Sequence, residues 1–192
     1  MITIAGAARR SYTFPAPIDA AFRFNADVDR MLGLLPHIAV VDAPSLAARR
    51  LCYEATESGL YLVRIHCTVL AEIDERARRI RIRPADDPAP DHAGFRTMSG
   101  RGRYDSAIDF HASGDTTRID YEVKLAAKLP VAASLRPIPT VLLARSARRI
   151  FHARLDEILD GFVRRSIAEY RRVSVRPPRD SGTVRATRGH RA

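Results

Sequence analysis

Apolar and polar residues alternate with two different periods along the chain, and each change of period marks a boundary between elements. Residues 9–14 alternate as a short strand that runs into two prolines. From Ile18 to Leu35 the apolar residues recur three, four and seven positions apart. This spacing predicts two short helices with a break near Asn25, whose side chain can cap the second one, and Pro36 ends the pair.

Between residues 37 and 129 the period is two, which predicts strands joined by short turns. The apolar residues of these segments fall on one face and the charged residues on the other, the pattern of an antiparallel sheet covered on one side. A segment rich in Pro, Asp and Gly, residues 85–94, predicts a loop. The strands are expected at 37–43, 47–56, 60–73, 78–84, 100–112 and 116–129, and with 9–14 they make a curved seven-stranded sheet.

A long amphipathic helix is expected at 140–171, after a proline-broken apolar connector at 130–139. At 1.5 Å per residue this helix measures about 48 Å, which is longer than a usual strand. It must therefore lie across a strongly curved sheet, and Gly161 offers a position for a gentle bend.

The order of these elements resembles the helix-grip superfamily of START lipid-transfer domains, birch-pollen-allergen-like proteins and polyketide cyclases (SRPBCC). Two stretches carry the resemblance, "YTFPAPIDAAFRF" and "LLARSARRIFHARLDEILDGFVRRSIAEY", within residues 8–172. The resemblance implies an α+β, START-like domain over residues 1–172, in which the sheet wraps the last helix and the two short helices after strand 1 close one end. It also implies a cavity that holds an apolar or amphipathic small molecule.

Tyrosines on the inner face of the sheet give the cavity independent support. A tyrosine combines an apolar ring with a hydroxyl that needs a partner when it is buried, and such groups suit a pocket with a few oriented polar contacts. The alternative is a solid core in which these hydroxyls satisfy one another. The expected ligand-binding residues are Tyr53, Tyr61, Ile65, Cys67, Phe95, Tyr104, Phe110, Tyr121, Val123 and Phe151.

Charge adds a second possible partner. The net charge is +10, and the terminal segment 173–192 holds five arginines and one aspartate. With no apolar period and a Pro-Pro pair, we expect this tail to be disordered. A basic interaction module for nucleic acid or a protein is therefore an alternative function. We do not expect nucleic acid as the partner, because the body lacks a dense basic cluster interleaved with exposed aromatics.

The connector before the last helix, "KLPVAASLRPIPTVLL", is apolar and flanked by Lys128, Arg136 and Arg145. Phe95 and Met98 are expected nearby. Apolar residues framed by cations suit docking on an anionic bilayer, although the same residues could simply cover the end of the sheet. No run of residues is apolar enough to span a membrane. The expected location is the cytoplasm, with peripheral membrane binding as a further option.

Catalytic chemistry is sparse. The six histidines form no metal-binding spacing, and the two cysteines, Cys52 and Cys67, fall on opposite faces as reduced thiols. "SGRGRYD" (99–105) resembles a phosphate loop only superficially and predicts a turn at the start of a strand. We expect no cofactor, no metal and no catalytic residue. An enzyme of the cyclase or dehydratase kind, using Tyr104, Tyr121 and His152, remains the alternative to a binder. The oligomeric state stays open.

Overall fold

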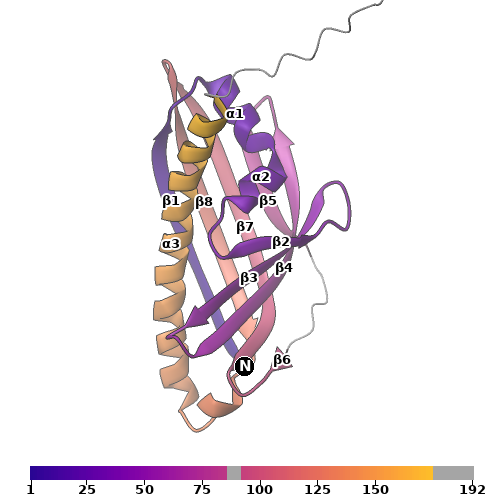
Figure 1. The fold of residues 1–192 in the computed structure, drawn as a ribbon, viewed down its shortest axis with the longest axis vertical. Coiled ribbons are helices and arrows are strands. Elements are labelled where there is room, and N and C mark those ends of the chain that lie inside the picture. The colour runs from indigo at the N-terminus through magenta and orange to yellow at the C-terminus, as the bar shows by residue number, and fades with distance from the viewer. Residues whose placement is uncertain (86–91, 175–192) are drawn as a thin grey trace, which may run out of the picture.

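A single sheet and one long helix dominate the structure (Figure 1). The computed structural model describes residues 1–85 and 92–174. The sheet has eight strands in the order β1-β8-β7-β5-β4-β3-β2, and β6 pairs with β7 outside this path. The strands are β1 (Ile2–Phe14), β2 (Ile38–Asp42), β3 (Ala48–Glu57), β4 (Tyr61–Asp74), β5 (Arg79–Ala85), β6 (His92–Ala93), β7 (Thr97–Ser113) and β8 (Thr116–Leu129).

The helices occupy the positions that the apolar spacing predicts. Two short ones, α1 (Ile18–Ala26) and α2 (Val28–Gly33), follow β1. A 3₁₀ turn, η1 (Ala133–Leu135), lies in the connector, and α3 runs from Thr140 to Ser174. The terminal segment expected to be disordered lies outside the described residues from 175 onward, as do residues 86–91 of the expected loop.

The sheet differs from the prediction in two places. It has eight strands instead of seven, because the expected loop 85–94 contains the two-residue strand β6. This strand pairs with Ser99 and Met98 of β7. The first strand begins at Ile2 and pairs with β8 along its whole length, from Ile2 opposite Leu129 to Phe14 opposite Thr117. Alanines and a glycine in the first half of β1 dilute the alternation, so the sequence pattern shows only the second half.

The sheet is also not wholly antiparallel. The pairing of β5 with β7 ends at Ile82, and beyond it β4 pairs directly with β7 in parallel, from Leu62 opposite Thr97 to His66 opposite Arg101. The stretch 99–105 lies inside β7, so the turn predicted there is wrong. Its glycines permit close approach instead: a Cβ on Gly102 would lie 2.5 Å from Ile65 Cγ2.

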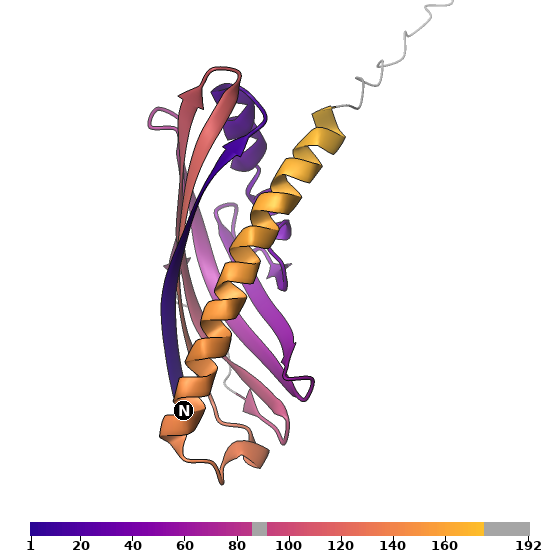
Figure 2. The ribbon, with the colours of Figure 1, turned by 90° about the vertical axis from the view of Figure 1, so that its left-hand side faces the viewer.

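Helix α3 crosses one face of the sheet, as the curvature argument predicts (Figure 2). Its 35 residues extend over about 52 Å. Two glycines allow tight contacts along it. A Cβ on Gly6 of β1 would lie 2.9 Å from His152 Cε1, and a Cβ on Gly161 would lie 2.3 Å from Pro36 Cγ. Gly161 therefore makes room for the proline that follows α2.

The short helices close one end of the sheet with a solid aromatic core. The ring of Tyr170 in α3 lies 4.9 Å from Phe14 and 5.3 Å from Phe24. The break between α1 and α2 falls at Asp27, whose side chain accepts a hydrogen bond from Arg30 N and caps α2. The prediction that Asn25 caps α2 is wrong. It is buried in α1 and donates to the carbonyl oxygen of Ala21.

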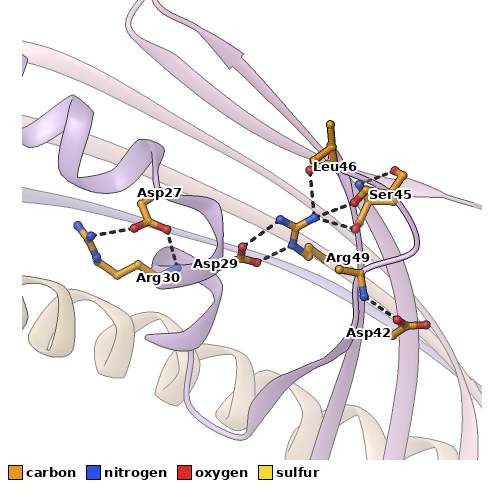
Figure 3. A network of polar contacts seen from close by, with 9 residues as sticks. Asp27, Asp29, Arg30, Asp42, Ser45, Leu46 and Arg49 are labelled. Carbon is orange, nitrogen blue, oxygen red and sulfur yellow. Dashed lines mark hydrogen bonds and ion pairs between the residues drawn. The ribbon is translucent and has the colours of Figure 1, made fainter.

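An ion pair holds α2 against the start of β3 (Figure 3). Arg49 Nε and Nη2 donate to the two carboxylate oxygens of Asp29 at 2.5 and 2.9 Å. The same guanidinium donates to the carbonyl oxygens of Ser45 and Leu46. This bidentate pair connects the closed end of the molecule to β3, one wall of the interior.

Candidate ligand-binding cavity

A cavity of about 260 Å³ lies between the inner face of the sheet and the first half of α3. Its walls are mostly aliphatic side chains from β1, β3, β4, β7, β8 and α3. The exposed residues Ser58 and Ser146 belong to its rim, so it opens between the β3–β4 turn and α3. Representative apolar residues of its wall are Ile4, Val63, Met98, Leu125, Leu143 and Ile150.

Six of the ten predicted ligand-binding residues line this cavity. Tyr53 comes from β3, Tyr104 from β7 and Phe151 from α3, while the remaining three come from β4. All of them follow from the alternation of the strands or the apolar stripe of the helix. The six are Tyr53, Tyr61, Ile65, Cys67, Tyr104 and Phe151.

The other four lie outside the cavity wall. Phe110 and Tyr121 belong to the solid core, where their rings lie 5.3 Å from Phe22 and 4.9 Å from Phe162. Val123 is buried in the same core. Phe95 is 67% exposed, with the guanidinium of Arg96 over its ring. Alternation predicts which face of the sheet a residue lies on. It does not predict where along the strand the cavity ends and the solid core begins.

Apart from its tyrosines, the polar part of the cavity wall was not predicted. Glu57, Arg154 and Ser58 line the cavity together with Tyr53. The sequence pattern places Glu57 in a turn, and it places Arg154 among the many arginines on the polar face of the helix. The local sequence pattern around either residue does not indicate the ion pair between Glu57 and Arg154, because the two are 97 residues apart in the chain.

Glu57 is the centre of this polar group, and its side chain is only 14% exposed. Its Oε1 accepts hydrogen bonds from the Tyr53 hydroxyl and from Arg154 Nε, both at 3.0 Å. Arg154 Nη2 donates to Glu57 Oε2 at 3.3 Å, and Nη1 donates to Glu157 Oε2 at 2.5 Å. His37 Nε2 lies 3.1 Å from Glu157 Oε1.

The pKa values of this group follow from these contacts. Hydrogen bonds to Glu57 and then Glu157 raise the pKa of Arg154 above its usual value, so its charge is fixed. The bonds from His37 and Arg154 lower the pKa of the Glu157 carboxyl. Burial, with the nearby Glu57 charge, raises the pKa of Tyr53, which therefore stays a neutral donor.

A second polar contact lies at the boundary between the cavity and the solid core. The hydroxyls of Tyr104 and Tyr121 are 2.6 Å apart and fully buried. Burial raises the pKa of both phenols, so neither acts as a base near neutral pH. Ser106 Oγ is buried beside them.

The thiols and histidines add little reactive chemistry to the cavity. Both cysteines are free, and burial raises the pKa of Cys67 to about 12. His152 is exposed, lies beside Gly6 of β1 and does not line the cavity. Within residues 1–85 and 92–174 no cluster of three His, Cys, Asp or Glu could hold a metal ion. No helix in these ranges is long and apolar enough to cross a membrane.

Comparison with known proteins supplies structural neighbours only. No protein-family model and no curated protein matches the sequence. The Zhui aromatase/cyclase from Streptomyces sp. R1128 has a similar structure, with a TM-score of 0.55 and 13% identity over 88% of this chain and 96% of that one. A conserved protein from Geobacillus kaustophilus gives a TM-score of 0.51 and 8% identity over 87% and 96% of the chains.

A protein from Thermus thermophilus gives a TM-score of 0.50 and 21% identity over 85% of this chain and 99% of that one. Identities this low show a shared fold and no more. The chain therefore has the helix-grip fold that the order of elements in its sequence predicts.

Proposed function

We propose that the cavity binds an apolar or amphipathic small molecule. The observation that carries this proposal is a hollow of about 260 Å³ with mostly aliphatic walls and one polar group beside its opening. Such a site can exclude water from a ligand of that shape, and each ~200 Å² of apolar surface removed from water favours binding by about 5 kcal/mol before the cost of association. The fold alone would not support this, since function depends on the site.

The described walls favour binding over catalysis. Glu57 is the carboxylate among the described lining residues, and Arg154 and Tyr53 already occupy much of its hydrogen-bonding capacity. The phenols of Tyr53 and Tyr104 keep their protons because burial raises their pKa values, and no histidine is among these lining residues. A cyclase-like reaction would need a base or acid poised near its working pH. We therefore propose a carrier or sensor of the ligand rather than an enzyme.

Binding of the neutral dye N-phenyl-1-naphthylamine tests this proposal. Ala147 in α3 lines the cavity, so Ala147→Trp should fill the hollow and abolish dye fluorescence. Arg148 is exposed on the same helix and does not line the cavity, and Arg148→Trp should bind dye as the wild type does. Thermal melting checks that both variants fold. No dye binding by the wild type, or equal binding by Ala147→Trp, would contradict the proposal.

We further propose that one pole of the molecule docks on an anionic bilayer. Phe95, Ile138, Val141 and Leu142 are 67, 41, 79 and 56% exposed. The first of these is joined to the connector, because Ser134 Oγ donates to the carbonyl oxygen of Phe95 at 2.6 Å. The stretch 125–150 carries five Lys and Arg and no Asp or Glu. Exposed apolar side chains among cations match the interface of an anionic membrane.

Co-sedimentation with vesicles tests the docking surface. Vesicles of phosphatidylglycerol and phosphatidylcholine should bind the protein, and vesicles of phosphatidylcholine alone should bind it much less. Val141→Asp with Leu142→Asp should abolish binding, whereas Val41→Asp with Ile73→Asp should not, since these residues are exposed outside the pole. The docking proposal would be overturned if both double variants lost vesicle binding equally. It would also be overturned if the wild-type protein bound nucleic acid but not vesicles.

A further inference from the structure

The polar group at the cavity opening carries information on the ligand itself. Tyr53, Glu57 and Arg154 all line the cavity, so their polar atoms meet a wall that is otherwise mostly aliphatic. We propose that the ligand is an apolar molecule that ends in a neutral hydroxyl, and that this hydroxyl binds between Glu57 and Arg154. This inference rests on the proposed binding function and narrows its ligand class.

The hydrogen-bonding capacity of the group suits a hydroxyl. A carboxylate offers about four lone-pair sites. Among the described residues three bonds reach Glu57, from the Tyr53 hydroxyl, Arg154 Nε and Arg154 Nη2. One acceptor site therefore remains. Arg154 has five N–H donors, of which the contacts to Glu57 and Glu157 use three. A hydroxyl both donates and accepts, so it can satisfy the two residues together.

The charge of the group disfavours an acidic ligand. Two carboxylates, Glu57 and Glu157, surround the single guanidinium of Arg154. A ligand carboxylate would lie against Glu57 and would compete with two acids for one cation. A ligand ammonium would lie against Arg154, whose charge its contacts hold fixed. A neutral hydroxyl avoids both repulsions, and it also costs less to remove from water than an ion.

The same contacts would be explained if the group only braced the β3–β4 hairpin against α3. A brace gives no preference among ligands of one shape, whereas a binding site does. Glu57→Gln separates these roles, because it removes the negative charge and keeps a side chain of nearly the same size. Glu54 on the same strand is exposed and bonded to Arg64, so Glu54→Gln is the matched control.

Displacement of N-phenyl-1-naphthylamine by decan-1-ol, decanoate and decylamine is the test, since the three share one alkyl chain. For the wild type and Glu54→Gln we expect decan-1-ol to compete at least about tenfold better than decanoate, a difference of about 1.4 kcal/mol. For Glu57→Gln we expect weaker binding of decan-1-ol and stronger binding of decanoate.

The outcomes separate the inference from the function it rests on. Equal competition by the three compounds, or the tightest binding by decanoate or decylamine in the wild type, would overturn the hydroxyl site and leave the binding cavity standing. An unchanged order in a folded Glu57→Gln would do the same. Absence of dye binding would instead remove the proposed function. The wild-type series alone decides the inference if Glu57→Gln does not fold.

Discussion

The hydroxyl oxygens of Tyr104 and Tyr121 lie 2.6 Å apart in the interior and join the neighbouring strands β7 and β8. Tyr104 lines the cavity, whereas Tyr121 packs on Phe162 in the solid core. The pair therefore marks the level at which the hollow ends. One hydroxyl donates a hydrogen bond to the other in a region where an unpaired polar group is costly.

Removing one of the two hydroxyls should lower the free energy of unfolding by more than half of what removing both lowers it. Tyr104→Phe or Tyr121→Phe leaves a buried hydroxyl without its partner, and we expect each to lower the free energy of unfolding by about 1–3 kcal/mol. The double variant should lose less than the sum of the two, because it leaves no orphaned group. Urea denaturation of the four proteins gives the coupling energy. Additive losses would show that the hydroxyls do not interact.

Ionisation of the tyrosines should track unfolding at high pH. Burial raises the pKa of Tyr12, Tyr104 and Tyr121 above the ordinary value of 10.0. Above that pH the unfolded chain binds fewer protons than the folded one, so stability must fall as the pH rises. We expect a late phase of tyrosinate absorbance that coincides with loss of the far-ultraviolet circular dichroism signal.

The combined variant Tyr104→Phe, Tyr121→Phe should reduce the amplitude of that late phase. A single absorbance transition that precedes any loss of structure would contradict burial as the cause.

The thiol of Cys67 should report on ligand occupancy. Burial raises its pKa to about 12, so little thiolate is present near neutral pH and modification should be at least about tenfold slower than for an exposed thiol. In a Cys52→Ser background, methyl methanethiosulfonate should label Cys67 slowly, and saturating N-phenyl-1-naphthylamine should slow the labelling further. Labelling that the dye does not change would place the dye outside the cavity.

Glycine to alanine changes in two helices should have opposite signs. Alanine normally stabilises a helix interior by up to about 1 kcal/mol relative to glycine. At Gly161 the new Cβ would lie 2.3 Å from Pro36 Cγ, so we expect Gly161→Ala to destabilise the protein by about 1–3 kcal/mol. At Gly33 no atom of the described residues, apart from its chain neighbours and its own helix backbone, lies within 4 Å of the new Cβ, so Gly33→Ala should be neutral or stabilising. Thermal melting distinguishes the two, and equal shifts would contradict the contact with Pro36.

The sequence pattern predicts which face of each strand is buried better than it predicts what lies against that face. Alternation correctly placed Ile80 and Ile82 inside, and it put Tyr104 and Phe110 on one face. Yet Tyr104 lines the hollow and Phe110 is sealed by Phe22, because α1 covers only one end of the sheet. The boundary depends on contacts between segments far apart in the chain.

The candidate polar site shows the same limit more sharply. Tyr53 was predicted from its strand period, whereas Glu57 and Arg154 were not predicted, since they meet only when α3 crosses the β3–β4 hairpin. The first half of β1 escaped prediction for a local reason. Its small residues carry little hydrophobic contrast, and its place is set by its pairing with β8.

The parallel contact between β4 and β7 exists only where β5 no longer separates them. A longer β5 would have to insert between the two strands and move them apart by about one strand spacing, ~4.8 Å. That would enlarge the circumference of the sheet around the hollow while leaving the closed end untouched. Insertions or deletions in β5 would therefore change the width of the cavity in related chains.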